Sequence, residues 1–523
     1  MKRLRLDHRL VIGLLLILCV GFLLRSWRAA ELMRFTGDEA RDLRKAKAVI
    51  AYQSLSVTGP KIYRGQGNLG PAYTYLMAIP LWIAGYDPAT SVWVVLLLDT
   101  LAIGLVFLLT RELMGSPADW VAAGLYAVSF TAVFYARWGW HPSLLPFFTL
   151  LAILGMIWAL RRNPWYIVLS AACLAVLVQL HASAVLIAVP LCWTLWLLRK
   201  RLRGWILVMT IALPLIILSP VLLREIVRGF SDISAMFGMK SVLFEKLQGG
   251  FPRFLMDIAQ APADQAYWPY GIRVVLAPEF AWMYWINIIW LLAGIASLII
   301  IFVKYMKKDV SGKTVSTAVI IGLWLVLIPF SLIMFGGQRS HYYMLSWFPV
   351  ALITAAAAAH LLLKHPWSRW LMIFILGLSL GTNLLTWSRY VDKVGASQYD
   401  TFFAGSLKQK KEAVSAIVQD AAGASYDVQV VSWYWSNYKP YAYLFDNAAN
   451  PPRTMHVLEV NLETKKQVLR RNELGDFIHW KKRPKSAKFT YFILEPKGLI
   501  ELPGTILIAD LGQLSVLREE KSK

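Results

Sequence analysis

Two adjacent carboxylates, Asp38 and Glu39, stand where the first apolar stretch of the chain ends. A carboxylate at the membrane surface can act as a general base that takes a proton from a hydroxyl group. The residues that follow, 39–52, carry apolar side chains at helical spacing, which predicts an amphipathic helix lying flat on the membrane. Because the N-terminus of a helix stabilises an ionised carboxylate, Asp38 at the start of this helix is the candidate base.

The same segment also carries a structural motif. Thr36 followed three residues later by Glu39 is the pattern of a capping box, in which each of the two side chains bonds a backbone N–H at the start of the helix. In that interpretation Asp38 only complements the helix dipole. The structural and catalytic interpretations are compatible, and the local sequence does not choose between them.

The composition is that of a membrane protein. The chain has 523 residues, of which 57% are hydrophobic and only 16% charged, and this excludes a soluble globular protein. The net charge of +23 does not indicate nucleic acid, because many of the Lys and Arg residues cluster between apolar runs, where they orient the chain and contact membrane lipid. All three cysteines lie inside apolar runs, so no disulfide framework and no cysteine metal site are predicted.

Apolar runs of the length that crosses a bilayer, about 20 residues, predict about eleven spans. They lie near residues 10–28, 90–110, 118–136, 142–160, 165–181, 183–198, 204–223, 281–303, 315–336, 341–363 and 369–388. A further run, 71–85, is short and contains two prolines. If it crossed the membrane, every later basic cluster would face outward, so the positive-inside rule predicts an interfacial or re-entrant helix instead.

This topology places the N-terminus on the cytoplasmic side of a multi-pass protein of the plasma membrane. The outer face then carries a first loop of about 30–88, a second large loop of about 224–280, and the C-terminal tail. We expect an all-α transmembrane domain over 1–388. Residues 389–523 alternate helix-like and β-rich stretches, which predicts a small extracytoplasmic α/β domain.

Two motifs of the first outer loop resemble those of the GT-C membrane glycosyltransferases. They are residues 37–41 (Gly-Asp-Glu-Ala-Arg) and 68–76 (Asn-Leu-Gly-Pro-Ala-Tyr-Thr-Tyr-Leu). Residues 339–349 (Arg-Ser-His-Tyr-Tyr-Met-Leu-Ser-Trp-Phe-Pro) resemble the motif that opens a late span of the same enzymes. The group with the greatest similarity is that of the protein O-mannosyltransferases and bacterial aminoarabinose transferases, glycosyltransferase family 39-like, and the similarity covers about residues 1–390.

The resemblance implies a GT-C fold and an inverting hexosyl or pentosyl transferase that uses a polyprenyl-phosphate sugar on the outer face. It assigns Asp38 as the catalytic base and Glu39 as its neighbour. Many members carry a second acidic residue in the turn before the fourth span, but residues 137–143 contain none. No metal ligand is therefore assigned, a divalent metal ion is left as a possible cofactor, and His141 is the polar group expected to face the pocket.

Displacing a sugar from a lipid phosphate builds negative charge on the leaving group, so the outer turns should supply cations. The residues predicted to bind the donor phosphate or the substrate are Arg339, His341, His141, Arg137, His181, Tyr73 and Tyr342. For the cations the alternative is that they cap span ends or reach to lipid headgroups. For His181 the alternative is a hydrogen-bonded turn histidine between two spans.

Two other functions are compatible with the sequence. A lipid-linked glycan flippase or transporter should pair polar residues in the middle of several spans, whereas Asp99, Gln179 and Asn383 are few and scattered. A non-catalytic envelope-assembly scaffold would act through its C-terminal domain and would tolerate changes at Asp38. The sugar is not indicated, nor is the acceptor, for which a protein, a lipid and a polysaccharide all remain open.

Overall fold

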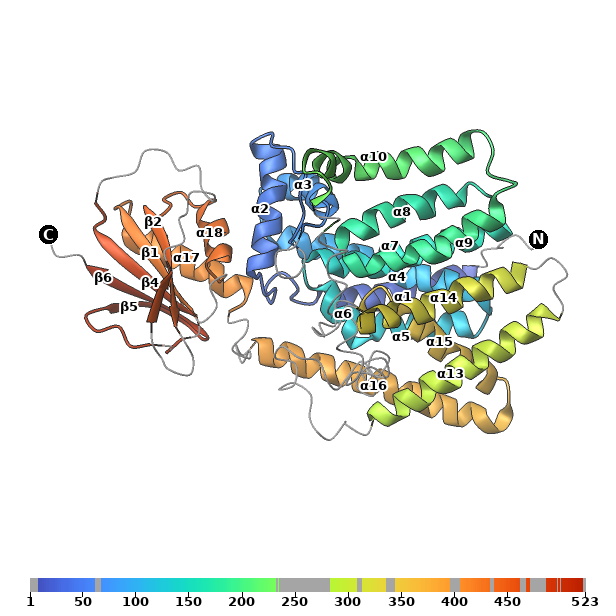
Figure 1. Cartoon of the computed structure of the whole chain (residues 1–523). Helices are drawn as coiled ribbons and strands as arrows, with labels where there is room; N and C mark the ends of the chain where they lie inside the picture. Colours follow the sequence, from blue (N-terminus) through green and yellow to red (C-terminus); the bar gives the residue numbers. More distant parts are fainter. Residues whose placement is uncertain are drawn as a thin grey trace.

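The computed structural model describes residues 8–61, 67–231, 234, 283–307, 313–334, 344–395, 405–432, 437–460, 467–470, 486–495, 497–498 and 500–520. Helices make up the part before residue 396, and the strands are confined to the C-terminal part. The C-terminal sheet lies at one end of the helical bundle, and α1 begins at the other end (Figure 1). The predicted second outer loop, 224–280, lies almost wholly outside the described residues.

The helices follow the apolar runs of the sequence. They are α1 (His8–Ser26), α2 (Gly37–Ala51), α3 (Ala72–Ile83), α4 (Ala89–Leu113), α5 (Ala118–Val128), α6 (Phe130–Ala136), η2 (His141–Leu144, 3₁₀), α7 (Leu145–Arg161), α8 (Tyr166–Leu180), η3 (Ala182–Ile187, 3₁₀), α9 (Ala188–Leu198), α10 (Trp205–Val227), α13 (Met283–Met306), α14 (Lys313–Met334), α15 (Phe348–Leu362), α16 (Pro366–Gly395), α17 (Leu407–Ala421) and α18 (Tyr438–Phe445). α16 therefore continues past residue 388, the boundary expected from composition.

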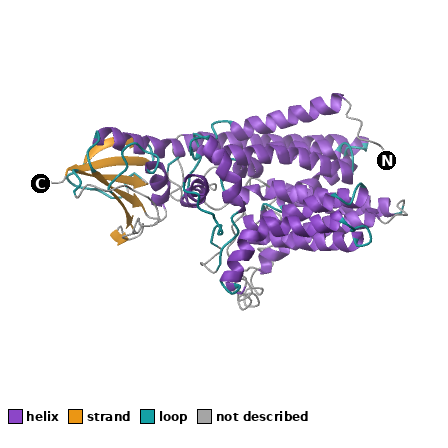
Figure 2. Ribbon diagram, turned by 90° about the horizontal axis from the view of Figure 1, so that it is seen from above, coloured by secondary structure: helices purple, strands orange, loops and turns teal. Residues whose placement is uncertain are grey.

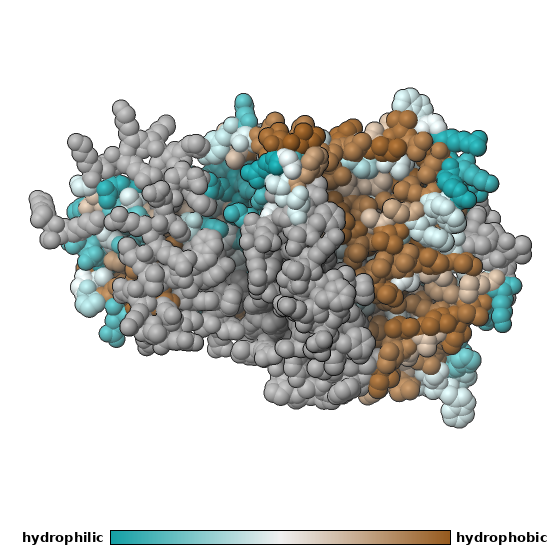
Figure 3. Space-filling model, in the orientation of Figure 1, coloured by the Kyte–Doolittle hydropathy of each residue, from teal (hydrophilic) through white to brown (hydrophobic). Residues whose placement is uncertain are grey.

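The chain is a multi-pass membrane protein. Among the described residues, six helices are long and apolar enough to cross a membrane, and α5 with α6 adds a seventh if the bent pair is one span. Five shorter apolar helices lie at 72–83, 166–180, 182–198, 314–327 and 348–362. Apolar helices thus occupy all eleven predicted positions, while the number that cross stays a prediction. Figure 3 shows the hydrophobic side chains gathered on the surface of the helical part.

The bent pair depends on a buried ion pair. α5 and α6 meet at 54°, and the break leaves carbonyl groups at the end of α5 without helical partners. Arg25, fully buried, donates to the carbonyls of Tyr126 and Ala127, and its Nε lies 2.7 Å from a carboxylate oxygen of Asp99. The Tyr126 hydroxyl donates to the second oxygen of Asp99 at 2.6 Å. Asp99, on α4, therefore bonds residues of α1 and α5.

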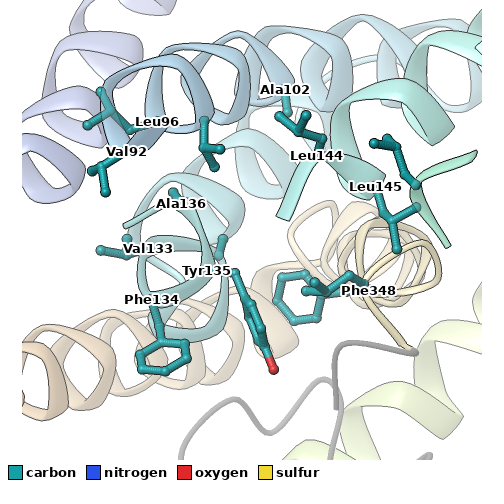
Figure 4. Packing of buried hydrophobic residues seen from close by; sticks show 14 of the residues in the cluster. Val92, Leu96, Ala102, Val133, Phe134, Tyr135, Ala136, Leu144, Leu145 and Phe348 are labelled. Atoms are coloured by element: carbon teal, nitrogen blue, oxygen red, sulfur yellow. The ribbon is translucent and has the colours of Figure 1, made fainter. Parts of the chain in front are cut away.

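The core of the bundle is packed around α15. Every residue of α15 from Phe348 to His360 is buried, and its alanines allow neighbouring helices to approach closely. Gly294 of α13 lies so near that a Cβ there would be 2.3 Å from the carbonyl oxygen of Thr354. Figure 4 shows Phe348 among side chains of α4, α6 and α7. The helices that lead into the predicted first outer loop and the turn at 137–140 are thus held by close packing.

Two short helices lie between the bundle and the C-terminal domain. α2 runs across the ends of the membrane helices (Figure 1) and packs against α3. α3 has 12 residues, about 18 Å of helix, which is too short to cross the hydrocarbon core. Its Ile79, Trp82 and Ile83 are exposed, as expected for a helix that rests on lipid.

The C-terminal domain is a six-stranded sheet with helices packed against it. Its strands are β1 (Tyr426–Ser432), β2 (Thr454–Val460), β3 (Gln467–Arg470), β4 (Phe489–Glu495), β5 (Ile506–Leu511) and β6 (Leu514–Glu520), in the order β3-β2-β1-β4-β6-β5. β1 pairs in parallel with β2 and β4, and the outer pairs are antiparallel. All seven residues of β4 are buried, so this strand is covered on both faces. Figure 2 shows the sheet as a layer beyond the helices.

Candidate active site

Glu39 is the fixed member of the predicted acidic pair. Its Oε2 accepts the backbone N–H of Thr36 at 2.7 Å, and the predicted capping box is present. The side chain is fully buried. Burial raises the pKa of Glu39 to about 7, against the lowering effect of the hydrogen bonds from Thr36 and the charge of Lys410. Glu39 therefore holds the first turn of α2 and does not present its carboxylate to water.

Asp38 is the accessible member of the pair. Its side chain is 52% exposed, and one carboxylate oxygen lies 2.7 Å from Nη1 of Arg41. The residue stands in the first turn of α2, where the helix dipole favours its charge. Of the carboxylates at this end of α2, Asp38 is the one that an incoming hydroxyl group can reach.

Asp42 connects α2 to the turn before the fourth predicted span. Its Oδ1 accepts Nε of Arg41 at 2.8 Å, and its Oδ2 lies 3.0 Å from Nδ1 of His141. Burial alone would raise the pKa of Asp42, but the charge of Arg41 and the hydrogen bond from His141 lower it to about 2. Asp38, Arg41, Asp42 and His141 thus form one continuous network, in which Arg41 stays charged.

The turn that carries His141 packs against α3 and α4. The Tyr73 hydroxyl donates to the carbonyl of Gly139, and the Tyr73 and His141 rings meet edge to face at 6.1 Å. A Cβ on Gly139 would lie 2.1 Å from Oγ of Ser91, so only glycine fits against α4 at this point. Tyr73 is 2% exposed. The structure places it as a support for His141, where the sequence predicted a substrate contact.

Arg137 is the clearest departure from the predicted set. Its Nη1 donates to the carbonyls of Arg25 and Trp27 at the end of α1, and its guanidinium lies 4.5 Å from the ring centre of Trp387. These contacts tie α1 to the turn at 137–140. A side chain held by backbone carbonyls of another span acts as a cap, so we do not carry Arg137 into the proposed phosphate site.

His181 lies at the junction of α8 and η3. Its Nδ1 accepts the backbone N–H of Ser183 at 3.2 Å and lies 2.8 Å from the Ser183 hydroxyl. This is the hydrogen-bonded turn histidine given as the alternative. α8 contacts η2, the turn that begins with His141.

Three of the predicted residues, Arg339, His341 and Tyr342, lie outside the described residues.

Basic side chains of α2 and α10 hold the first loop. Nζ of Lys45 donates to the carbonyls of Thr58 and Gly59 at 3.0 and 2.9 Å. Arg224, at the end of α10, donates to the carbonyls of Val57 and Asn68 at 3.1 and 3.2 Å. The loop between α2 and α3 is therefore braced by fixed cations, which also raise the positive potential around the acidic pair.

Lys439 of α18 adds a cation from the C-terminal domain. Burial lowers the pKa of Lys439, the charge of Arg41 lowers it further, and the charges of Asp38 and Asp42 raise it. Lys439 is therefore within electrostatic range of the network. α18 packs against α2, so the C-terminal domain brings this basic residue to α2 from about 400 positions later in the chain.

Asp42 and Lys439 were missed by sequence reasoning, for different reasons. Asp42 follows Asp38 by four positions, so the two share one face of a helix, and that spacing was an available signal. Lys439 has no local signal, because its place depends on how the C-terminal domain docks.

The described residues do not offer a metal centre, since they contain no group of three or more His, Cys, Asp or Glu that could hold a metal ion. Asp42 is already bonded to Arg41 and His141, which uses both of its oxygens. Within the described part of the chain the donor set does not fit a metal site, and we derive no step through one.

Solved structures share the fold of this chain. ArnT from Cupriavidus metallidurans, solved bound to undecaprenyl phosphate, matches with a TM-score of 0.55 over 98% of each chain at 13% identity. An oligosaccharyltransferase from Archaeoglobus fulgidus, solved in complex with Zn and sulfate, matches with a TM-score of 0.51 at 15% identity, over 85% of this chain and 62% of that one. No family model matches the chain, and no curated protein matches it. The chain therefore has the GT-C fold of these membrane glycosyltransferases, and the resemblance stated from the sequence is confirmed at the level of fold.

Proposed function

We propose that the protein is an inverting glycosyltransferase that moves a sugar from a polyprenyl-phosphate donor to an acceptor hydroxyl on the outer face of the plasma membrane. The observation that carries this proposal is the accessible carboxylate of Asp38, 52% exposed, at the head of a helix that crosses the ends of the bundle. It is held there by the Arg41–Asp42–His141 network. The GT-C fold is the scaffold on which such a site is expected.

The reaction assigns a role to each group. Asp38 takes the proton of the acceptor hydroxyl as the acceptor oxygen attacks the anomeric carbon from the face opposite the phosphate. The bond between the anomeric carbon and the phosphate oxygen breaks, and its electron pair leaves with the polyprenyl phosphate. One displacement inverts the anomeric carbon, and Asp38 ends the step protonated.

The cations on α2 and α18 suit the leaving phosphate. Arg41 carries a permanent charge, and its Nη2 is buried without a hydrogen-bond partner among the described residues, so this nitrogen has a donor capacity that none of them uses. Lys439 acts on the same network. Fixed cations beside a developing negative charge stabilise the transition state more than the ground state.

The neighbouring structures support the choice of donor. ArnT binds undecaprenyl phosphate in its solved structure, and this chain shares its fold over nearly the whole length. We extend that lipid class to the present protein as part of the proposal. The acceptor and the sugar are left open.

The described polar groups within the spans do not favour a transporter. Asp99 bonds Arg25 and Tyr126, Asn383 accepts the backbone N–H of Phe130, and Gln179 donates to carbonyls of two helices. Each of the three groups named for that alternative is engaged in helix packing. A transport path needs polar groups that can exchange their partners with a substrate.

The test is release of free polyprenyl phosphate by the purified full-length protein in lipid nanodiscs. It is supplied with a panel of undecaprenyl-phosphate pentoses and hexoses and with cell-envelope extract as the source of acceptor. Asp38→Asn keeps the size of the side chain and an oxygen for Arg41 but removes the base, and we expect release to fall by roughly 10²- to 10⁴-fold.

The matched control is Glu31→Gln. Glu31 also pairs with an arginine three positions away, Arg28, at 2.7 Å, but this pair is partly exposed. Among the described residues it has no bond to Asp38, Asp42 or His141, so release should be unchanged. Equal release by Asp38→Asn and the wild type would refute Asp38 as the base. No release from any donor would favour the transport and scaffold alternatives.

A further inference from the structure

A lysine of the C-terminal domain reaches the segment that leads into α2. Lys410 of α17 is 4% exposed. Its Nζ donates to the carbonyls of Arg34 and Phe35 at 3.1 and 3.2 Å. These are the two residues directly before Thr36, the N-cap of α2. The ammonium group therefore bonds the backbone directly before the helix that carries the candidate base, Asp38.

The segment that Lys410 holds is strained. Phe35 has a φ of 46°, in the left-handed region that costs a residue with a side chain about 1–2 kcal/mol. Its ring is fully buried and meets the ring of Tyr443, on α18, edge to face at 5.6 Å. The backbone N–H of Leu407 also donates to the carbonyl of Met33 at 2.6 Å. A conformation of this kind persists only where its surroundings impose it, and here the contacts from Lys410, Tyr443 and Leu407 all come from the C-terminal domain.

The charge of Lys410 is balanced inside the same domain. Nζ lies 3.3 Å from a carboxylate oxygen of Glu495, at the end of β4, and Glu495 is 1% exposed. The other oxygen of Glu495 accepts the Tyr441 hydroxyl at 3.0 Å. Lys410 also acts electrostatically on Glu39, the buried member of the acidic pair. Because a buried ammonium group is stable only beside such partners, Glu495 and the two carbonyls hold Lys410 against the residues that precede α2.

Other contacts between the two parts of the chain differ from this one. Lys411, the next residue of α17, pairs with Asp87 at 2.9 Å, but both side chains are about half exposed. Lys47 pairs with Asp446 at 2.6 Å on the far part of α2. These pairs hold the domains together without bonding the backbone before Thr36.

We propose that the C-terminal domain contributes to the catalytic site by positioning Asp38. Lys410 is the positioning residue, because it holds the backbone directly before α2 and so orients the N-terminus of that helix. This inference rests on the proposed function for its catalytic consequence. Its structural part, that Lys410 orders residues 33–40, holds or fails without any substrate.

The first measurement is hydrogen exchange of the peptide covering residues 33–41 in the full-length protein in nanodiscs, with no donor present. Lys410→Met should raise exchange in this peptide by about tenfold, because the two carbonyls lose their donor and the strained turn opens. Lys411→Met is the matched control, as it makes the same change one residue along α17. It should leave exchange at 33–41 unchanged.

The second measurement is the rate of undecaprenyl phosphate release with whichever undecaprenyl-phosphate sugar the wild type accepts. A displaced base should lower kcat by about tenfold or more and leave the KM for the donor nearly unchanged. Because Lys410→Met leaves Glu495 buried without a cation, the double variant Lys410→Met/Glu495→Gln is included. It removes both charges and should restore the thermal midpoint.

The outcomes separate a positioning role from a general one. If the double variant regains the thermal midpoint but keeps fast exchange at 33–41 and a low kcat, Lys410 positions the site. If its kcat recovers with its midpoint, or if Lys410→Met leaves exchange at 33–41 unchanged, the proposal is wrong. If the wild type releases nothing from any donor, the proposed function fails and the exchange data alone decide whether Lys410 orders this segment.

Discussion

Replacing Asp42 by asparagine tests whether the network behind Asp38 stabilises the protein as its geometry indicates. Asp42 is 2% exposed and bonds both Arg41 and His141. The folded protein lowers its pKa from 3.8 to about 2. At 1.36 kcal/mol per pKa unit, the charged form is favoured by about 2 kcal/mol in the folded state.

The sign of the pH dependence follows from this shift. Because the folded-state pKa is lower than the unfolded value, the contribution of Asp42 is fully present above about pH 4 and is lost as the pH falls towards 2. Asp42→Asn should therefore lose at least about 2 kcal/mol at pH 7, and more if Arg41 is left short of an acceptor. The difference from wild type should narrow as the pH falls from about 4 to about 2.

The assay is thermal unfolding in nanodiscs, followed by tryptophan fluorescence at several pH values. Asp87→Asn is the control, because Asp87 forms a half-exposed pair with Lys411 and such pairs contribute about 0–1 kcal/mol. An Asp42→Asn midpoint equal to that of the control, or a difference from wild type that does not change with pH, would refute the reasoning. The release assay should show a parallel loss of activity, since His141 and Arg41 lose their common partner.

Three further predictions follow from single contacts. Burial raises the pKa of Glu39 from 4.5 to about 7. The charged carboxylate therefore lowers the stability of the folded protein by about 3 kcal/mol above pH 7 and by nothing below about pH 4. Glu39→Gln should raise the thermal midpoint at pH 8 and leave it unchanged at pH 4. Gly139→Ala places a Cβ 2.1 Å from Oγ of Ser91 and should lower release by about tenfold or more, with partial recovery when Ser91→Gly is added. Asp99→Asn leaves Arg25 buried without its carboxylate and should cost roughly 3–5 kcal/mol, seen as a lower midpoint and a lower yield of folded protein.

The sequence predicted most of the membrane architecture because the length of each apolar run is a local property of the sequence. A bilayer requires about 20 apolar residues per span, and the helices lie on the runs identified in this way. The break in the third of these runs was not predicted. It depends on Arg25 bonding carbonyls about 100 residues away, and hydropathy carries no information on such a contact.

In the candidate site, the sequence predicted the local motif but not the contacts between residues that are far apart in the chain. The capping box of Thr36 and Glu39 is present as expected, because both partners lie within one helical turn. The function expected for Arg137 was derived from its place in an outer turn, and that of Tyr73 from its place in the motif at 68–76. In the structure the hydroxyl of Tyr73 and a guanidinium nitrogen of Arg137 bond backbone carbonyls of the fold, a choice that only packing can make.

By itself the sequence determined that this is a multi-pass membrane protein, with an acidic pair at the head of an amphipathic helix and a C-terminal part rich in strands. These features follow from periodicity and from groups a few residues apart. Only the tertiary structure decided that Asp38 is accessible while Glu39 is buried, that Asp42 meets His141, and that Lys410 bonds the backbone before α2. The physical reason is that burial and ion pairing are set by groups 99 and 376 positions apart, which approach one another only when the domains pack.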